Sequence, residues 1–87
     1  MSQIEKLLGR FFTKPRDFTW KELISVLESF GYRELPSGKT GGSRRKFADS
    51  EKRIISLHKP HPGQIVKVYV IEQLIANFKE NGKIKND

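Results

Sequence analysis

Two short stretches of the sequence carry the side chains best suited to chemistry. The first, residues 40–47 (Thr-Gly-Gly-Ser-Arg-Arg-Lys-Phe), is a glycine turn that runs into a basic strand. The second, residues 54–62, is an apolar strand that ends in two histidines, each followed within two residues by a proline. Because cations and imidazoles bind and act on phosphates, the two stretches are candidates for one polyanion site.

The alternation of side chains along a strand predicts which of these residues share a face. We expect the apolar Phe47, Ile55 and Leu57 to face the core. The opposite face then carries two cations, a hydroxyl and an imidazole, contributed by Arg44, Lys46, Ser56 and His58. This face is predicted to bind a polyanion, and RNA is the polyanion that we favour.

The two histidines, His58 and His61, are the residues that can move protons near neutral pH. Either can act as general acid or base when the 2′-hydroxyl of RNA attacks the neighbouring phosphate. Arg44 or Lys46 can stabilise the crowded phosphorane without a metal ion. The alternative is that both histidines contact phosphate without catalysis. Their three-residue interval, with no acidic residue close by in sequence, gives little support to a metal site, so we expect no metal and no cofactor.

Gly42 and Ser43 precede the basic strand and can offer backbone amides and a hydroxyl to a phosphate. They lack the spacing of a P-loop and lead into a strand rather than a helix, which argues against nucleotide triphosphate binding. A plain hairpin loop is the alternative. The predicted RNA contacts are Gly42, Ser43, Arg44, Arg45, Lys46, Ser56 and Lys59.

The positive charge of the chain is concentrated in its middle. The formal net charge is +7, and residues 33–67 hold nine Lys and Arg against three Asp and Glu. Both ends carry mixed charges, as solvated helices do, whereas a concentrated positive segment is typical of nucleic-acid surfaces. A charge that only keeps the protein soluble is the alternative.

Length and composition narrow the class of protein. Eighty-seven residues, 36% of them hydrophobic, are enough for one domain with a modest core. The absence of cysteine excludes disulfides and zinc–thiolate sites. No apolar run reaches the roughly 18 residues of a membrane span, and the N-terminus shows no secretory signal. We therefore expect a cytoplasmic protein with no membrane partner.

Apolar spacing and turn residues predict the element order α–α–β–β–β–α. Helices are expected over about residues 2–12, 20–30 and from 66 or 68 to about 80, and strands over 32–35, 43–48 and 53–58. Ser2 with Glu5, and Thr19 with Glu22, have capping-box spacing, and Gly31 stands where a helix C-terminal glycine belongs.

This order indicates an α+β fold, in which helices cover one face of a three-stranded antiparallel meander and leave the other face wet. Residues 1–18 are interpreted as an N-terminal helix and linker, and residues 19–87 as the main domain. We expect the first helix to pack on this domain; an interaction arm is the alternative.

Three stretches taken together resemble the HicA (YcfA-like) toxins of bacterial toxin–antitoxin pairs. They are Glu-Ser-Phe-Gly-Tyr at 28–32, Lys-Thr-Gly-Gly-Ser-Arg-Arg-Lys-Phe at 39–47, and residues 54–75, and the resemblance extends over residues 19–82. It implies a fold similar to a double-stranded RNA-binding domain (dsRBD-like, α–β–β–β–α), with residues 2–12 as an additional helix. It also implies ribosome-independent cleavage of mRNA and inhibition by a HicB-type antitoxin.

The sequence departs from this family at one position that matters for chemistry. The family pattern typically has a histidine, assigned as catalytic, directly after Gly-Ser, and here Arg44 holds that place. A guanidinium is permanently protonated and makes a poor general base. Either His58 takes over the proton transfer, or the protein binds RNA without cutting it.

Our first interpretation is therefore a toxin that acts as a metal-independent endoribonuclease. In this reading His58 is the acid or base, His61 is a second candidate, and Arg44 and Lys46 stabilise the phosphate. The alternatives are a non-catalytic RNA-binding module of the same fold and a basic domain whose main ligand is an acidic protein partner.

Overall fold

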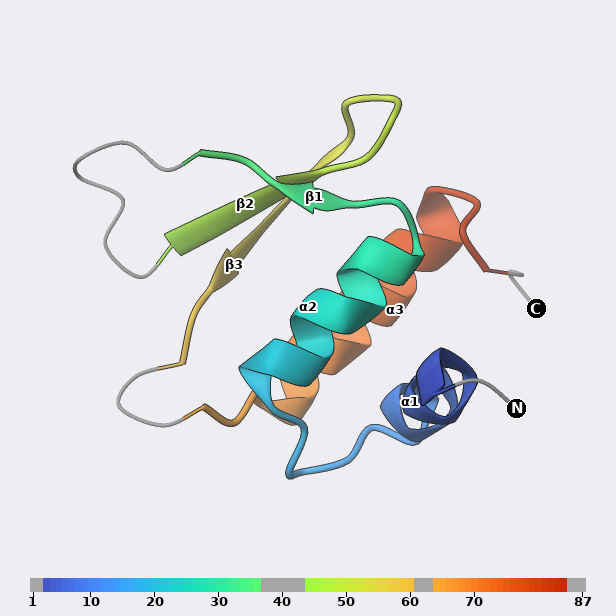
Figure 1. Ribbon diagram of the computed structural model, residues 1–87, viewed down its shortest axis with the longest axis vertical. Coiled ribbons are helices and arrows are strands. Elements are labelled where there is room, and N and C mark those ends of the chain that lie inside the picture. Colours follow the sequence, from blue (N-terminus) through green and yellow to red (C-terminus); the bar gives the residue numbers. More distant parts are fainter. Residues whose placement is uncertain (1–2, 37–43, 61–63, 85–87) are drawn as a thin grey trace.

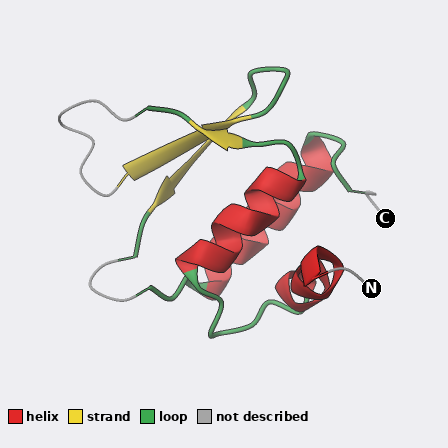
Figure 2. Cartoon of the chain, viewed as in Figure 1, coloured by secondary structure: helices red, strands yellow, loops and turns green. Residues whose placement is uncertain are grey.

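The computed structural model describes residues 3–36, 44–60 and 64–84, which form three helices and a three-stranded antiparallel sheet (Figures 1 and 2). The elements follow the predicted order: α1 (Gln3–Phe12), α2 (Trp20–Ser29), β1 (Arg33–Glu34), β2 (Arg44–Ala48), β3 (Ile54–His58) and α3 (Val68–Glu80). This is the predicted dsRBD-like α+β fold with an added N-terminal helix. Within the described ranges, no helix is long and apolar enough to cross a membrane.

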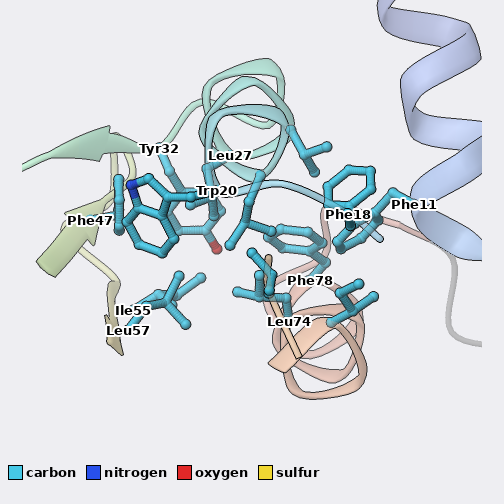
Figure 3. Packing of buried hydrophobic residues seen from close by; sticks show 14 residues of the cluster. Phe11, Phe18, Trp20, Leu27, Tyr32, Phe47, Ile55, Leu57, Leu74 and Phe78 are labelled. Atoms are coloured by element: carbon cyan, nitrogen blue, oxygen red, sulfur yellow. The ribbon is translucent and has the colours of Figure 1, made fainter. Parts of the chain in front are cut away.

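The elements are arranged in layers. The sheet, ordered β1–β2–β3, has α2 and α3 on one face, and α1 lies on the far side of these two helices from the sheet (Figure 1). The core fills the space between the sheet, α2 and α3 and continues to α1 (Figure 3). None of the described elements covers the outer face of the sheet, which they leave to solvent or a ligand.

The start of α2 is fixed by the predicted capping box. The Thr19 hydroxyl accepts a hydrogen bond from the backbone N–H of Glu22 at 3.1 Å, and the Glu22 carboxylate accepts one from the backbone N–H of Thr19 at 2.9 Å. Two backbone donors that have no partner within the helix are satisfied in this way. The capping box predicted at Ser2 lies outside the described residues.

Helices α2 and α3 end in the same way. Gly31 and Gly82 follow the two helices with φ of +90° and +74°, a conformation that glycine adopts without a steric penalty. The backbone N–H groups of the next residues, Tyr32 and Lys83, donate to carbonyls five positions earlier at 3.0 and 2.7 Å. Each end is thus a Schellman motif, which stops the helix where its apolar stripe ends.

The N-terminal ends of α2 and α3 are held together by backbone pairing. Thr19 and Ile65 form an isolated antiparallel bridge, the N–H of Trp20 donates to the carbonyl of Gln64 at 2.7 Å, and the N–H of Val66 donates to the carbonyl of Phe18 at 2.7 Å. Because Val66 takes part in this pairing, α3 begins at the later of the two predicted positions.

Helix α1 is joined to the domain by a charged cluster as well as by its apolar face. The guanidinium of Arg10 contacts the carboxylates of Glu22 at 2.6 Å and Asp17 at 2.8 Å and lies 5.2 Å from the ring centroid of Phe18. These contacts link α1, the connecting segment and α2. The N-terminal helix therefore packs on the domain and is not a free arm.

An aromatic cluster forms the centre of the core. The fully buried ring of Phe78 lies 4.6 Å from Phe30, 5.8 Å from Tyr32 and 6.0 Å from Phe11, measured between ring centroids. Phe11 also lies 5.6 Å from Phe18. One side chain of α3 thus contacts α1, the end of α2 and the segment that leads into β1.

A buried carboxylate ties the β2–β3 turn to the end of α3. Asp49 is 7% exposed; its Oδ1 accepts from the backbone N–H groups of Glu51 at 3.0 Å and Arg53 at 2.8 Å, and its Oδ2 lies 3.2 Å from Nζ of Lys83. Burial raises the pKa of Asp49, but the N–H of Arg53 and the ammonium of Lys83 outweigh it and hold this pKa below its ordinary value.

Replacement of Phe11 by alanine tests whether α1 belongs to the core. We expect Phe11→Ala to lower the free energy of unfolding by about 3 kcal/mol or more, because it removes a buried ring that contacts three others, those of Phe12, Phe18 and Phe78. Phe12→Ala, next to it and 39% exposed, is the control and should cost about 1 kcal/mol or less. Urea unfolding followed by Trp20 fluorescence measures the free energy of unfolding of both variants. A loss of only about 1 kcal/mol or less in Phe11→Ala as well would show that α1 is not part of the core.

The Asp49 carboxylate should make stability depend on pH in the acid range. Because its pKa in the folded state is lowered, its stabilisation is complete above the ordinary aspartate pKa of about 3.9 and is lost as pH falls through the lower folded-state value. Asp49→Asn keeps an acceptor oxygen but removes the charge. The variant should be less stable at pH 7, and the difference from wild type should shrink at acid pH. A difference that stays constant from pH 7 to pH 2, measured by thermal unfolding, would contradict this role.

Candidate functional site

The register of β2 and β3 brings the predicted polar residues onto one exposed face. Arg44 pairs directly with His58, and Lys46 pairs with Ser56. All four are exposed, and we call them together the cationic face. The face predicted from strand alternation is thus present in the structure.

The opposite face of the same two strands is buried and anchors them. Phe47 pairs with Ile55, and both are buried together with Leu57. The Phe47 ring lies 6.2 Å from that of Trp20 at the start of α2. Apolar packing on the inside therefore fixes which side chains point outward.

Arg44 and His58 are in contact across the two strands. The Nη2 atom of Arg44 lies 3.4 Å from Nε2 of His58. Because a guanidinium can only donate, a hydrogen bond here requires a neutral imidazole with its lone pair on Nε2 and its hydrogen on Nδ1. In this arrangement a potential proton acceptor and a permanent cation are close enough to contact one phosphate group.

Arg45 points away from the cationic face, although it is part of the same basic run. It pairs with Leu57 on the inner side of the sheet, its Nε lies 3.5 Å from the carboxylate of Glu34 in β1, and its Nη1 donates to the carbonyl of Arg44 at 3.1 Å. Arg44, Arg45 and Lys46 are consecutive in the sequence, but the alternation of side chains along a strand places Arg45 on the opposite face from the other two. The role of Arg45 as an RNA contact stays a prediction.

A groove of about 400 Å³ runs from the cationic face to the first turn of α3. Ser56, His58 and Lys59, three predicted site residues, line it together with residues that the sequence analysis did not select: Leu57, Pro60, Ile65, Val66, Lys67, Tyr69, Val70 and Gln73. Tyr69 carries a signal in the sequence, because it is an aromatic residue of α3 that falls outside the apolar stripe of that helix. The groove itself depends on how α3 lies against β3 and leaves no local pattern.

Three predicted site residues, Gly42, Ser43 and His61, lie outside the described residues. Their roles as phosphate contacts and as a second proton donor or acceptor stay predictions. Within the described ranges, no group of three or more His, Cys, Asp or Glu side chains is placed to hold a metal ion.

Comparison with models of known protein families gives a match over most of the chain. A family model described as the HicA toxin of bacterial toxin–antitoxin systems matches residues 20–81. This span contains α2, the three strands and α3, and it leaves out α1. The comparisons with curated proteins and with solved structures give no match.

Paired charge removals test whether the cationic face is the polyanion-binding surface. We expect the double variant Arg44→Ala/Lys46→Ala to leave a heparin column at clearly lower salt than wild type, because two neighbouring cations are lost from one face. The control Lys6→Ala/Lys21→Ala removes the same charge from exposed positions on α1 and α2. If the two double variants elute together, retention reflects only net charge and the face has no special role.

Proposed function

The chain belongs to the HicA toxin family of bacterial toxin–antitoxin systems, and on this premise we propose that it is an endoribonuclease that cleaves mRNA without a metal ion. The observation that carries the proposal is the contact between Arg44 and His58 at 3.4 Å on an exposed sheet face. An imidazole beside a cation is the minimum that cleavage by the 2′-hydroxyl requires.

The proposed reaction begins with proton transfer to His58. When Arg44 turns from Nε2 to the bound phosphate, the freed lone pair of Nε2 takes the proton of the 2′-hydroxyl, and the 2′-oxygen forms a bond to the adjacent phosphorus. The bond between phosphorus and the 5′-oxygen then breaks, and that oxygen takes up a proton from the imidazolium or from water. The products are a 2′,3′-cyclic phosphate and a free 5′-hydroxyl.

The cations of the same face supply the electrostatic part. The phosphorane carries more negative charge on its oxygens than the starting diester, so fixed cations near it lower the barrier. Arg44 is placed beside His58, and Lys46 follows two residues along β2 on the same face. Ser56, opposite Lys46, can add a hydroxyl contact.

In this proposal His58 on β3 takes over the role that a histidine at the position of Arg44 on β2 typically has in the family. The family typically has an imidazole at the position of Arg44, and here His58 is its direct partner across the strand pair. Residues directly opposite each other in an antiparallel pair have Cβ atoms about 4.5–5.5 Å apart. An imidazole contributed by β3 can therefore act on a phosphate held over β2.

We further propose a cytoplasmic setting and a HicB-type antitoxin as the protein partner. Family membership supports the partner, and the charge of the cationic face supports an acidic surface on it. An antitoxin that covered this face would both exclude RNA and block the reaction.

A second candidate function is non-catalytic RNA binding on the same fold. The observation that favours it is Arg44 itself, because the position that typically carries the catalytic imidazole in this family here carries a group unable to accept a proton. In this case His58 would only contact phosphate.

Cleavage in the presence of a chelator distinguishes the two functions. Wild-type protein, incubated with mRNA in excess EDTA, should give fragments that end in a 2′,3′-cyclic phosphate. His58→Ala should cut at least about 100-fold more slowly, because loss of a general acid–base group typically costs 10²–10⁴ in rate, and it should still bind RNA. Arg44→His, introduced into the His58→Ala protein, is the matched rescue and should restore part of the cleavage.

The other outcomes assign the function differently. If His58→Ala cuts as fast as wild type, His58 is not the acid–base group. If wild type binds RNA with steep salt dependence but forms no product, the second candidate is correct. If it neither binds nor cuts RNA, the basic face serves a protein partner.

A further inference from the structure

Tyr69, in the first turn of α3, is a large aromatic side chain that the fold leaves in solvent. It is 59% exposed, whereas Ile71, Leu74 and Phe78 of the same helix are fully buried. Among the described residues, its ring makes no aromatic or cation contact and its hydroxyl makes no hydrogen bond. Packing therefore gives no reason for an aromatic residue at this position.

The surroundings of Tyr69 indicate what kind of ligand it would meet. It lines the same groove as Ser56 and His58 of the cationic face, so a ligand chain bound over that face can continue past it. Lys59 and Lys67 also line the groove, and its described lining contains no acidic residue. The aromatic ring thus lies in a positively charged groove that begins at the proposed reaction centre.

We infer that Tyr69 is a stacking platform for an unpaired base and that the protein binds single-stranded RNA. This inference rests on the proposed function, which makes RNA the ligand. In a duplex both faces of each base are covered by neighbouring bases, and contacts are made to phosphates and 2′-hydroxyls. An aromatic side chain can stack on a base only where that base has a free face.

The arrangement assigns a separate task to each part of the groove. A phosphate contacts both Arg44 and His58, and the base of a neighbouring nucleotide lies on Tyr69. Lys59 and Lys67 neutralise the phosphates on either side of that base. Gln73, one helical turn after Tyr69, offers an amide to the edge of the base. The dsRBD-like fold is thus adapted to single strands by one exposed ring.

An acidic protein segment is the rival occupant, because Ile65, 45% exposed, adds apolar surface beside Tyr69. The charge of the groove fits both ligands, but only RNA offers flat bases for the ring. Stacking also predicts a dependence on the strandedness of the ligand, which a protein interface does not.

The test compares single-stranded and duplex RNA. Binding of a labelled, unstructured dodecamer and of the same sequence closed in a hairpin duplex is measured by fluorescence anisotropy, with His58→Ala as the parent so that no ligand is cut. Adding Tyr69→Ala should weaken binding of the single strand about tenfold and leave duplex binding unchanged. Tyr69→Phe keeps the ring and should bind like the parent. Phe12→Ala, an exposed aromatic on α1, is the control and should also bind like the parent.

Salt dependence separates stacking from charge. Tyr69→Ala removes no charge, so its affinity should fall without a change in the slope of log Kd against log salt concentration. Lys67→Ala should reduce that slope by about one. A changed slope in Tyr69→Ala would mean that the side chain acts by positioning phosphates and would overturn the stacking role.

A tryptophan at the same place gives a direct signal. In Tyr69→Trp the new indole should be quenched when the single strand binds, whereas the natural Trp20, 7% exposed, should contribute a constant background. Equal weakening of single-strand and duplex binding by Tyr69→Ala, or no weakening while the parent binds RNA, would overturn the inference. Failure of the parent and of wild type to bind any RNA would instead overturn the proposed function.

Discussion

Burial of Phe47 against Trp20 fixes the register of the sheet, and the cationic face takes its composition from that register. Phe47, Ile55 and Leu57 occupy the inner face, so their neighbours on β2 and β3 must point outward. A slip of one residue would turn Arg44, Lys46 and His58 into the core, where unpaired charges are strongly disfavoured. The apolar side of the two strands therefore specifies the chemistry of the other side, although no apolar residue takes part in that chemistry.

The proposed site consists of two regions, and different contacts fix the position of each. The cationic face is set by strand pairing and would be present in any antiparallel hairpin with this alternation. The groove is set by the placement of α3, which depends on the backbone bridge between Thr19 and Ile65 and on the aromatic cluster around Phe78. In the proposed function, the acid–base chemistry therefore lies on the sheet, and the ligand is selected where the sheet and α3 meet.

The features that could be predicted from the sequence are those with a local signal. The capping box at Thr19, the glycine at Gly31, the apolar stripe of α3 and the alternation along β2 and β3 each depend on residues close together in the chain, and the structure contains all of them. The features that were missed depend on contacts between distant segments. In the sequence alone Asp49 looks like an ordinary turn residue, and its contact with Lys83 exists only in the folded chain. Arg45 likewise looks like its basic neighbours, and only the fold shows that it pairs with Glu34.

The position of α1 has a consequence for the order in which the chain can fold during synthesis. Phe78 is synthesised well after its partner Phe11, and the two rings lie 6.0 Å apart in the folded core. Until residue 78 has left the ribosome, Phe11 and the apolar side chains around it have no complete surface to cover them. A chain that stops before residue 78 therefore leaves these aromatic side chains exposed, and such apolar surface makes an incompletely folded chain prone to aggregation. The core of this fold can therefore close only after α3 has been synthesised.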